Sequence, residues 1–206
     1  MMKRYLIILP LIIFLSIGCG DNLSTSTKDE SASVTANFLA GTWTAECVDN
    51  TTASTSTKTV LVFSAAADNL SSTSTNYSDL NCVTQNYVIT KTLSTLSLGT
   101  KSTTVQYQIM TKYTAVVSSI TLEPKTSNAA TSLNSTPYCG ITGWSSGAQT
   151  SIAGLTCGSI IYKAQNAVYN DLIQLNSEKT FIRLGNTTNL GSNGYPKTLY
   201  TEEYYK

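Results

Sequence analysis

The chain of 206 residues contains no histidine. That absence excludes Ser-His and Cys-His nucleophilic sites and every metal site that needs an imidazole ligand. Charged residues are also scarce, at 12% of the chain against about 25% in an average soluble protein. The 13 basic and 12 acidic side chains nearly cancel, which leaves no electrostatic basis for binding nucleic acid. We therefore expect no enzyme, no metal site, no cofactor and no nucleic-acid partner.

Helical periodicity is almost missing as well, and only residues 162–168 suggest a helical turn or two. Thr, Val, Ile and Tyr are frequent instead, and these residues suit the half-buried surface of a sheet. The predicted strands are 41–47, 57–64, 70–77, 87–97, 103–111, 115–123, 149–153, 168–175 and 179–184. In 113–122 the apolar positions drift by one residue, which predicts a β-bulge. Many short strands at regular spacing predict an all-β fold, an antiparallel barrel or sandwich.

The N-terminus has the form of a signal peptide. Lys3 and Arg4 precede an apolar run over residues 5–17 that is broken only by Pro10 and Ser16. A bilayer-spanning helix needs about 20 apolar residues, so this run is too short to cross a membrane. We expect residues 1–18 to be removed.

The end of this segment, Leu15-Ser16-Ile17-Gly18-Cys19, resembles the lipobox of bacterial lipoproteins, although Ser16 stands where Leu is usual. The resemblance implies that Cys19 becomes the mature N-terminus and is acylated, and several acyl chains give stable anchoring. Gly20 after the cysteine, rather than Asp, favours the outer membrane, with the periplasmic and the surface-exposed face both open. The alternative is an ordinary signal peptide followed by a chance cysteine.

The segment after the lipobox is small and polar. Residues 19–37 contain no aromatic side chain, so they cannot bury enough surface to fold, and we expect a flexible tether. No second linker of similar length follows. Residues 38–206 are therefore expected to form one domain, and we expect a monomer.

Four cysteines remain beyond Cys19, namely Cys47, Cys82, Cys139 and Cys157. An even number in an exported chain predicts two disulfides, for which three connectivities exist. We favour Cys47–Cys82 and Cys139–Cys157, because each pair joins near neighbours in an up-and-down strand order. The spacing lacks CxxC pairs and gives little support for a metal site.

The first predicted strand carries Gly41-Thr42-Trp43, which resembles the Gly-x-Trp entry motif of lipocalins. Five further features resemble the pattern of a family of lipocalin-like bacterial lipoproteins. They are Cys47, the apolar strand 60–64, Tyr-x-Asp-x-x-Cys at 77–82, Cys-Gly-x-x-x-Trp at 139–144 and the ending 204–206. This resemblance implies an antiparallel up-and-down barrel in which Trp43 closes one end. It also implies that Arg183, the one arginine left after signal-peptide removal, stacks on Trp43. The family implies no common activity.

Three further motifs are better explained without catalysis. Residues 143–147 match G-x-S-x-G, but a nucleophilic serine needs a histidine base and a strand–turn–helix context, so we expect a surface loop. Glu202 and Glu203 are adjacent, and neighbouring strand residues point to opposite faces, which suits solvated side chains rather than an acid/base pair. The tyrosines at 195, 200, 204 and 205 favour a final strand packed on the barrel over a binding surface.

Two functions remain. A membrane-tethered barrel could carry a small apolar ligand or lipid in its interior. Alternatively, a packed barrel could act through its exterior, as an adhesin or envelope scaffold. An apolar cavity on the order of several hundred Å³ would support a carrier, whereas an interior filled by side chains would support an interaction protein.

Overall fold

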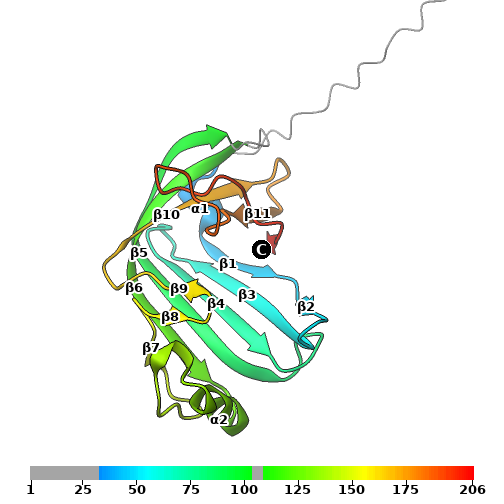
Figure 1. The fold of residues 1–206 in the computed structure, drawn as a ribbon. Helices are drawn as coiled ribbons and strands as arrows, with labels where there is room; N and C mark the ends of the chain where they lie inside the picture. Colours follow the sequence, from blue (N-terminus) through cyan, green and yellow to red (C-terminus); the bar gives the residue numbers. More distant parts are fainter. Residues whose placement is uncertain (1–32, 104–108) are drawn as a thin grey trace, which may run out of the picture.

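The computed structural model describes residues 33–103 and 109–206 (Figure 1). The predicted signal peptide, Cys19 and most of the tether lie outside these ranges. The strands before the large insertion are β1 (Gly41–Ala45), β2 (Val48–Asn50), β3 (Thr55–Phe63), β4 (Leu70–Tyr77), β5 (Gln85–Thr103) and β6 (Ile109–Pro124). The strands after β6 are β7 (Thr150–Ser151), β8 (Thr156–Cys157), β9 (Ile160–Ile161), β10 (Val168–Leu175), β11 (Phe181–Leu184) and β12 (Tyr204–Tyr205). The helices are α1 (Ala36–Leu39), α2 (Ser127–Ser135) and a 3₁₀ turn, η1 (Tyr138–Gly140).

Eight of these strands form a closed barrel in the order β1-β3-β4-β5-β6-β10-β11-β12. Every neighbouring pair is antiparallel, and β12 returns to pair with β1. Strand β2 pairs with β3 beyond β1, and β7 pairs with β6 beyond β10. The predicted all-β, antiparallel up-and-down barrel with two disulfides is therefore confirmed. Among the described residues, no helix has the length and apolar character needed to cross a membrane.

The bulge predicted in 113–122 is present in β6. Thr92 pairs with Ser119 and the next residue, Leu93, pairs with Val117, so Ser118 is the extra residue. Buried positions shift accordingly from the odd-numbered side, ending at Val117, to the even-numbered side, starting at Ile120. The β5 strand carries two irregularities of its own in the same pairing, after Ser94 and after Leu98. These bulges help the long β5–β6 hairpin to curl around the barrel (Figure 1).

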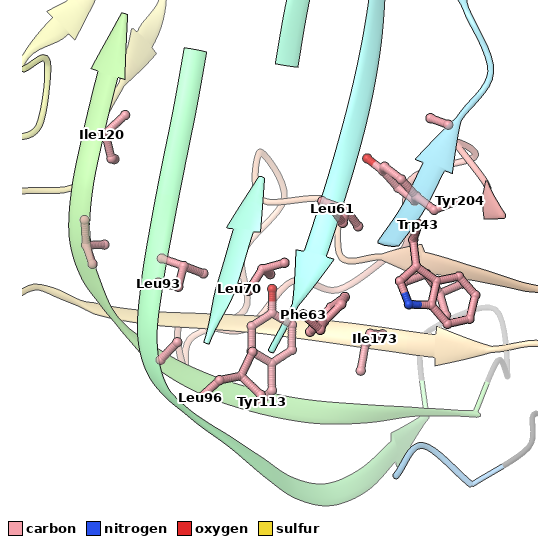
Figure 2. Packing of buried hydrophobic residues seen from close by; sticks show 14 of the residues in the cluster. Trp43, Leu61, Phe63, Leu70, Leu93, Leu96, Tyr113, Ile120, Ile173 and Tyr204 are labelled. Atoms are coloured by element: carbon pink, nitrogen blue, oxygen red, sulfur yellow. The ribbon is translucent and has the colours of Figure 1, made fainter. Parts of the chain in front are cut away.

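The two ends of the barrel differ. We call the end where α1 lies and β1 begins the closed end, and the opposite end, where β4 and β6 finish, the open end. The interior at the closed end is filled by large apolar side chains (Figure 2), among them Trp43, Leu61, Phe63, Leu70, Leu93, Tyr113 and Ile173. Trp43 is only 1% exposed, and its indole Nε1 donates a hydrogen bond of 2.7 Å to the Leu39 carbonyl of α1. This hydrogen bond attaches the short helix α1 to the closed end of the barrel.

Residues 125–167 form an insert between β6 and β10 at the open end. Its apolar side chains, including Leu133, Trp144 and Ile152, belong to the same buried cluster as Ile120 and Leu122 of β6. The insert therefore extends the core beyond the barrel itself.

Within residues 33–103 and 109–206, the one helix longer than a single turn is α2, which lies in this insert, and the sequence analysis did not predict it. Thr126 caps α2 by accepting a hydrogen bond of 3.0 Å from the Ala129 amide, and Ala129, Ala130 and Leu133 form its buried face. The helical turn suggested at 162–168 is wrong: 162–167 are turn and irregular backbone, and β10 starts at Val168.

The N-terminal boundary of the domain also differs from the expected residue 38. Helix α1 starts at Ala36, and Val34 and Ala36 pack against the core. These small apolar residues belong to the folded domain because the closed end offers them a surface to cover.

Candidate functional site

The predicted contact between Arg183 and Trp43 is wrong. In β11, Ile182 is fully buried and points inward, so its neighbour Arg183 points to the outer face. There the guanidinium pairs with Glu203 and lies 5.1 Å from the centre of the Phe181 ring. The cation over Trp43 is instead Lys206, whose Nζ lies 5.3 Å from the ring and donates a hydrogen bond of 3.1 Å to the Phe38 carbonyl.

Gly41 has a structural role at the same place. Its φ of +115° is rarely adopted by residues with a side chain, and a Cβ there would lie 3.1 Å from Cε of Lys206. Gly41, Trp43 and Lys206 therefore meet at the closed end. This end is packed with buried apolar side chains.

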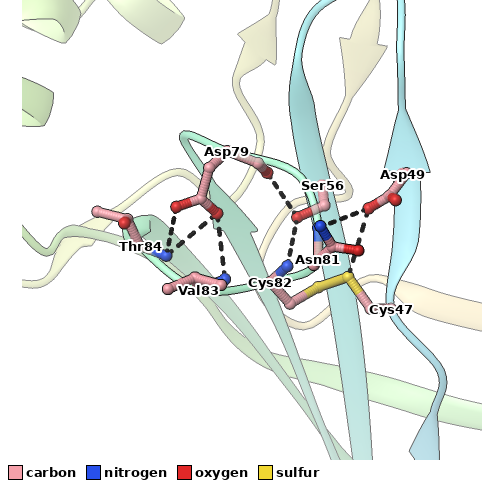
Figure 3. Close-up of a disulfide and its surroundings, with 8 residues drawn as sticks. All are labelled: Cys47, Asp49, Ser56, Asp79, Asn81, Cys82, Val83 and Thr84. Carbon is pink, nitrogen blue, oxygen red and sulfur yellow. Dashed lines mark hydrogen bonds between the residues drawn. A yellow bond between two sulfur atoms is a disulfide. The ribbon is translucent and has the colours of Figure 1, made fainter.

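Both disulfides have the favoured pairing, Cys47–Cys82 and Cys139–Cys157. The first joins the link between β1 and β2 to the β4–β5 turn, where the Tyr-x-Asp-x-x-Cys segment ends (Figure 3). The Asp79 carboxylate accepts hydrogen bonds from the backbone amides of Val83 and Thr84, at 3.1 and 2.9 Å. The Ser56 hydroxyl, buried on β3, donates to the Asp79 carbonyl and accepts from the Cys82 amide. This motif therefore stabilises a turn and provides no reactive group.

Towards the open end, the barrel interior contains a polar cavity of about 240 Å³, which we call the polar chamber. Its walls come from β3, β4, β5, β10, β11, β12 and the segment between β11 and β12. The lining residues are Thr59, Ser72, Ser74, Lys91, Tyr169, Asp171, Leu184, Gly185, Thr187, Tyr200, Glu202 and Tyr204. Hydroxyl groups predominate, together with one ammonium and two carboxyl groups.

Two hydrogen-bonded pairs of side chains, Lys91 with Tyr169 and Tyr113 with Asp171, lie at one wall of the polar chamber. Lys91 Nζ donates to the Tyr169 hydroxyl at 3.0 Å and lies 4.3 Å from the centre of that ring. Asp171, 2% exposed, accepts from the Tyr113 hydroxyl at 3.0 Å and from the Leu172 amide at 2.7 Å. The buried carboxyl group therefore has partners for both oxygens.

Burial controls the ionisation of these groups. It raises the pKa of Asp171 to about 6, against the opposing effects of Lys91 and the hydrogen bonds. Burial likewise lowers the pKa of Lys91, while the nearby Asp171 opposes that change. The pKa values of Tyr113 and Tyr169 are raised well above the usual value by burial and by the Asp171 charge. Both phenols therefore remain protonated and act as hydrogen-bond donors at neutral pH.

A second cavity, of about 370 Å³, adjoins the polar chamber, and we call it the vestibule. The two cavities share Lys91, Tyr169 and Thr187 in their linings. The vestibule lies between the barrel, the insert and the β11–β12 segment. Most of its apolar surface comes from Ile120, Ile160, Ile161, Tyr162 and Leu190.

An acidic groove of about 760 Å³ lies on another side of the polar chamber and shares Thr59 and Glu202 with it. Glu46, Asp49 and Glu203 also line this groove. The polar chamber thus lies between an apolar vestibule and an acidic groove.

The rejected motifs have structural places. Trp144 is buried. The Asn134 side chain donates a hydrogen bond of 2.9 Å to the Trp144 carbonyl and accepts hydrogen bonds of 2.8 Å from the backbone amides of Gly143 and Trp144. The G-x-S-x-G segment is therefore a loop attached to α2. Glu202 and Glu203 do point to opposite faces: Glu202 lines the polar chamber and accepts from Tyr204, whereas Glu203 bonds Arg183 outside. Of the four C-terminal tyrosines, Tyr204 is buried in the final strand, as favoured above, but Tyr200 and Tyr205 are exposed, and Tyr195 and Tyr200 lie outside the strands.

The sequence analysis missed Lys91 and Asp171. Their signal is a charged residue at an inward position of a predicted strand, since Lys91 alternates with Leu93 and Asp171 with Ile173. In comparisons with known proteins, no family model matches the chain and no curated protein is similar to it.

Proposed function

We propose that the chain is a bacterial lipoprotein anchored in the outer membrane, which binds a small molecule in its barrel and catalyses no reaction. The observation that supports ligand binding is the pair of adjoining cavities that share Lys91, Tyr169 and Thr187. An eight-stranded barrel is just wide enough to be filled by side chains or to hold one small ligand. In this chain the closed half is filled, whereas the open half is not.

The ligand hypothesis is tested on the full chain purified from its native membrane. Solvent extraction followed by mass spectrometry should release one class of small molecule in roughly equimolar amount. A Ser72→Val variant narrows the polar chamber, so it should release less of that molecule than a Ser71→Val control on the outer face of the same strand. Equal recovery of every extracted molecule from both variants would contradict binding in the chamber.

The anchor hypothesis rests on the sequence of residues 15–19. A Cys19→Ala variant has no thiol to acylate, so it should lose the lipid-linked mass and leave the lipoprotein-processing route. A Ser24→Ala variant should be acylated normally. Retention of the acyl-chain mass in the Cys19→Ala protein would exclude this cysteine as the anchor.

The alternative function is an envelope interaction protein that needs no ligand. Two observations favour it: the closed half of the barrel is filled, and the insert exposes Ile160 and Ile161, at 52% and 77%. This alternative predicts that no small molecule is extracted. It also predicts that cross-links to a neighbouring envelope protein are lost in an Ile161→Ser variant.

A further inference from the structure

We infer that the ligand is amphipathic and neutral: an uncharged polyol head, such as a sugar or glycerol unit, on a single apolar chain. This inference rests on the proposed function and specifies its ligand class. The head would occupy the polar chamber and the chain would lie in the vestibule.

The division of the two cavities supports an amphipathic ligand. Hydroxyl and charged groups line the polar chamber, while Ile120, Ile160, Ile161 and Leu190 line the vestibule. A wholly apolar ligand in the chamber would leave those polar groups without hydrogen-bond partners. A wholly polar ligand would leave the apolar side chains of the vestibule exposed to water. A molecule with both parts satisfies both linings.

The charges of the polar chamber argue against a charged head. Lys91 faces Tyr169 and the nearby Asp171, and Glu202 lies on the far side, bonded to Tyr204 at 2.5 Å. An anionic head would approach two carboxyl groups for one ammonium. A cationic head would approach Lys91. The charges already have partners within the chain, so a neutral head avoids a new unpaired charge in a half-buried space.

Hydroxyl groups in the polar chamber match the hydroxyl groups of a polyol. The side chains of Thr59, Ser72, Ser74 and Thr187 can each donate one hydrogen bond and accept others. Thr59 and Ser74 already form a hydrogen bond of 3.1 Å, in which one hydroxyl donates and the other accepts. The donor keeps both lone pairs for a ligand, and the acceptor keeps its own proton and one lone pair. A polyol has the same dual character at every hydroxyl, so it can pair with this lining in several places.

The full chain in phosphatidylcholine nanodiscs is titrated with a panel of probes by calorimetry, with empty nanodiscs subtracted. The panel is octyl glucoside and monooctanoylglycerol as neutral amphiphiles, decanoate as the anionic one, octyltrimethylammonium as the cationic one, and glucose as the head alone. We expect one of the two neutral amphiphiles to bind most tightly, and which of them does identifies the head as sugar or glycerol. Tighter binding of decanoate or of the ammonium probe overturns the inference.

Variants assign the two ends of the ligand. Ser72→Val should weaken binding by roughly 2- to 10-fold, the loss expected for one hydrogen bond, whereas Ser71→Val on the outer face should not. Ile161→Ser should also weaken binding, compared with Val83→Ser, an equally exposed apolar residue at 73% in a distant turn. Thr59→Val replaces Ser72→Val if the latter does not fold. Unchanged affinity in both chamber and vestibule variants overturns the inference.

The result also separates this inference from the proposed function. If the native membrane yields a bound molecule that is charged or wholly apolar, the ligand class is wrong and the binding function stands. If no molecule is extracted and no probe binds, both are wrong.

Discussion

The closed and open ends of the barrel are built from the same strands, yet on four of these strands the inward side chains change in character. On β3, Leu61 faces the closed end and Thr59 the open end, and on β4 the same change runs from Leu70 to Ser72. Strand β5 changes from Leu93 to Lys91, and β10 from Ile173 to Asp171. One inward face thus changes from apolar to polar within two residues on four strands.

Because of this change, the two ends of the barrel should contribute differently to folding stability. Apolar burial at the closed end supplies stability, because the free energy gained is proportional to the apolar area removed from water. The polar chamber contributes less to folding, since each buried polar group must first regain the hydrogen bonds that it loses with water. We therefore expect substitutions in the polar chamber to lower stability less than substitutions at the closed end. The following predictions test this difference, from the largest effect to the smallest.

Trp43→Ala should lower the free energy of unfolding by about 3–5 kcal/mol, because it leaves a cavity where the closed end is packed. Urea denaturation followed by circular dichroism measures the change. Val62→Ala, on the outer face of the neighbouring strand, should change it by less than about 0.5 kcal/mol. A small effect of Trp43→Ala would mean that the closed end does not provide the stability.

The two disulfides should act on different regions. One variant replaces both Cys47 and Cys82 with Ala and removes a cross-link between residues 35 positions apart. The second variant replaces both Cys139 and Cys157 with Ala and removes a cross-link between residues 18 positions apart. Each should lower the free energy of unfolding by roughly 2–4 kcal/mol. Hydrogen exchange localises the loss. The second variant should expose amides of the insert and leave β1, β3 and β12 protected. Faster exchange at Trp43 in that variant would contradict the independence of the two ends.

Asp171 should give stability an inverted dependence on pH. The pKa of Asp171 is about 6 in the folded chain, whereas the usual value of 3.8 applies in the unfolded chain. Between these pH values the folded state therefore binds more protons than the unfolded state. Stability from this group is therefore gained as pH falls from 7 towards 4. Compared with Asp171→Asn, the wild type should gain on the order of 2 kcal/mol over that range.

Asp79 is the control of opposite sign. Hydrogen bonds from Thr84 lower the pKa of Asp79, so its contribution is present above the usual pKa and is lost as pH falls through the lowered value. Chemical denaturation of wild type, Asp171→Asn and Asp79→Asn at several pH values measures both. The same sign for both carboxyl groups would show that burial does not dominate at Asp171.

Lys206→Met should have the smallest effect, a loss of about 0.5–1 kcal/mol for a partly exposed cation over an aromatic ring. Tryptophan emission should shift as the Trp43 environment changes. Arg183→Met should leave that emission unchanged, since Arg183 lies on the outer face beside Glu203. A shift with Arg183→Met and none with Lys206→Met would restore the pairing expected from the lipocalin resemblance.

Local sequence patterns predicted most of the barrel because each of them depends on a few neighbouring residues. Alternation located β3, β4 and β10, and the one-residue drift located the bulge near Ser118. An even number of cysteines in an up-and-down order led to the correct pairing. Helix α2 was missed because its polar, Ser-rich sequence has a short apolar face, although the Thr126 cap was visible.

Local sequence patterns could not predict the polar chamber. Lys91 and Tyr169 are 78 residues apart in the chain, and Tyr113 and Asp171 are 58 apart, so no local rule brings them together. The sequence by itself determined most of the barrel strands, the bulge, the opposite faces of Glu202 and Glu203 and the disulfide pairing, through alternation and short-range order. It did not predict β2, β8 or β9. Only the tertiary structure decided that Lys206 covers Trp43 and that a polar chamber lies beside an apolar vestibule. Both depend on the register in which distant strands close the barrel, and closure is a property of the whole sheet.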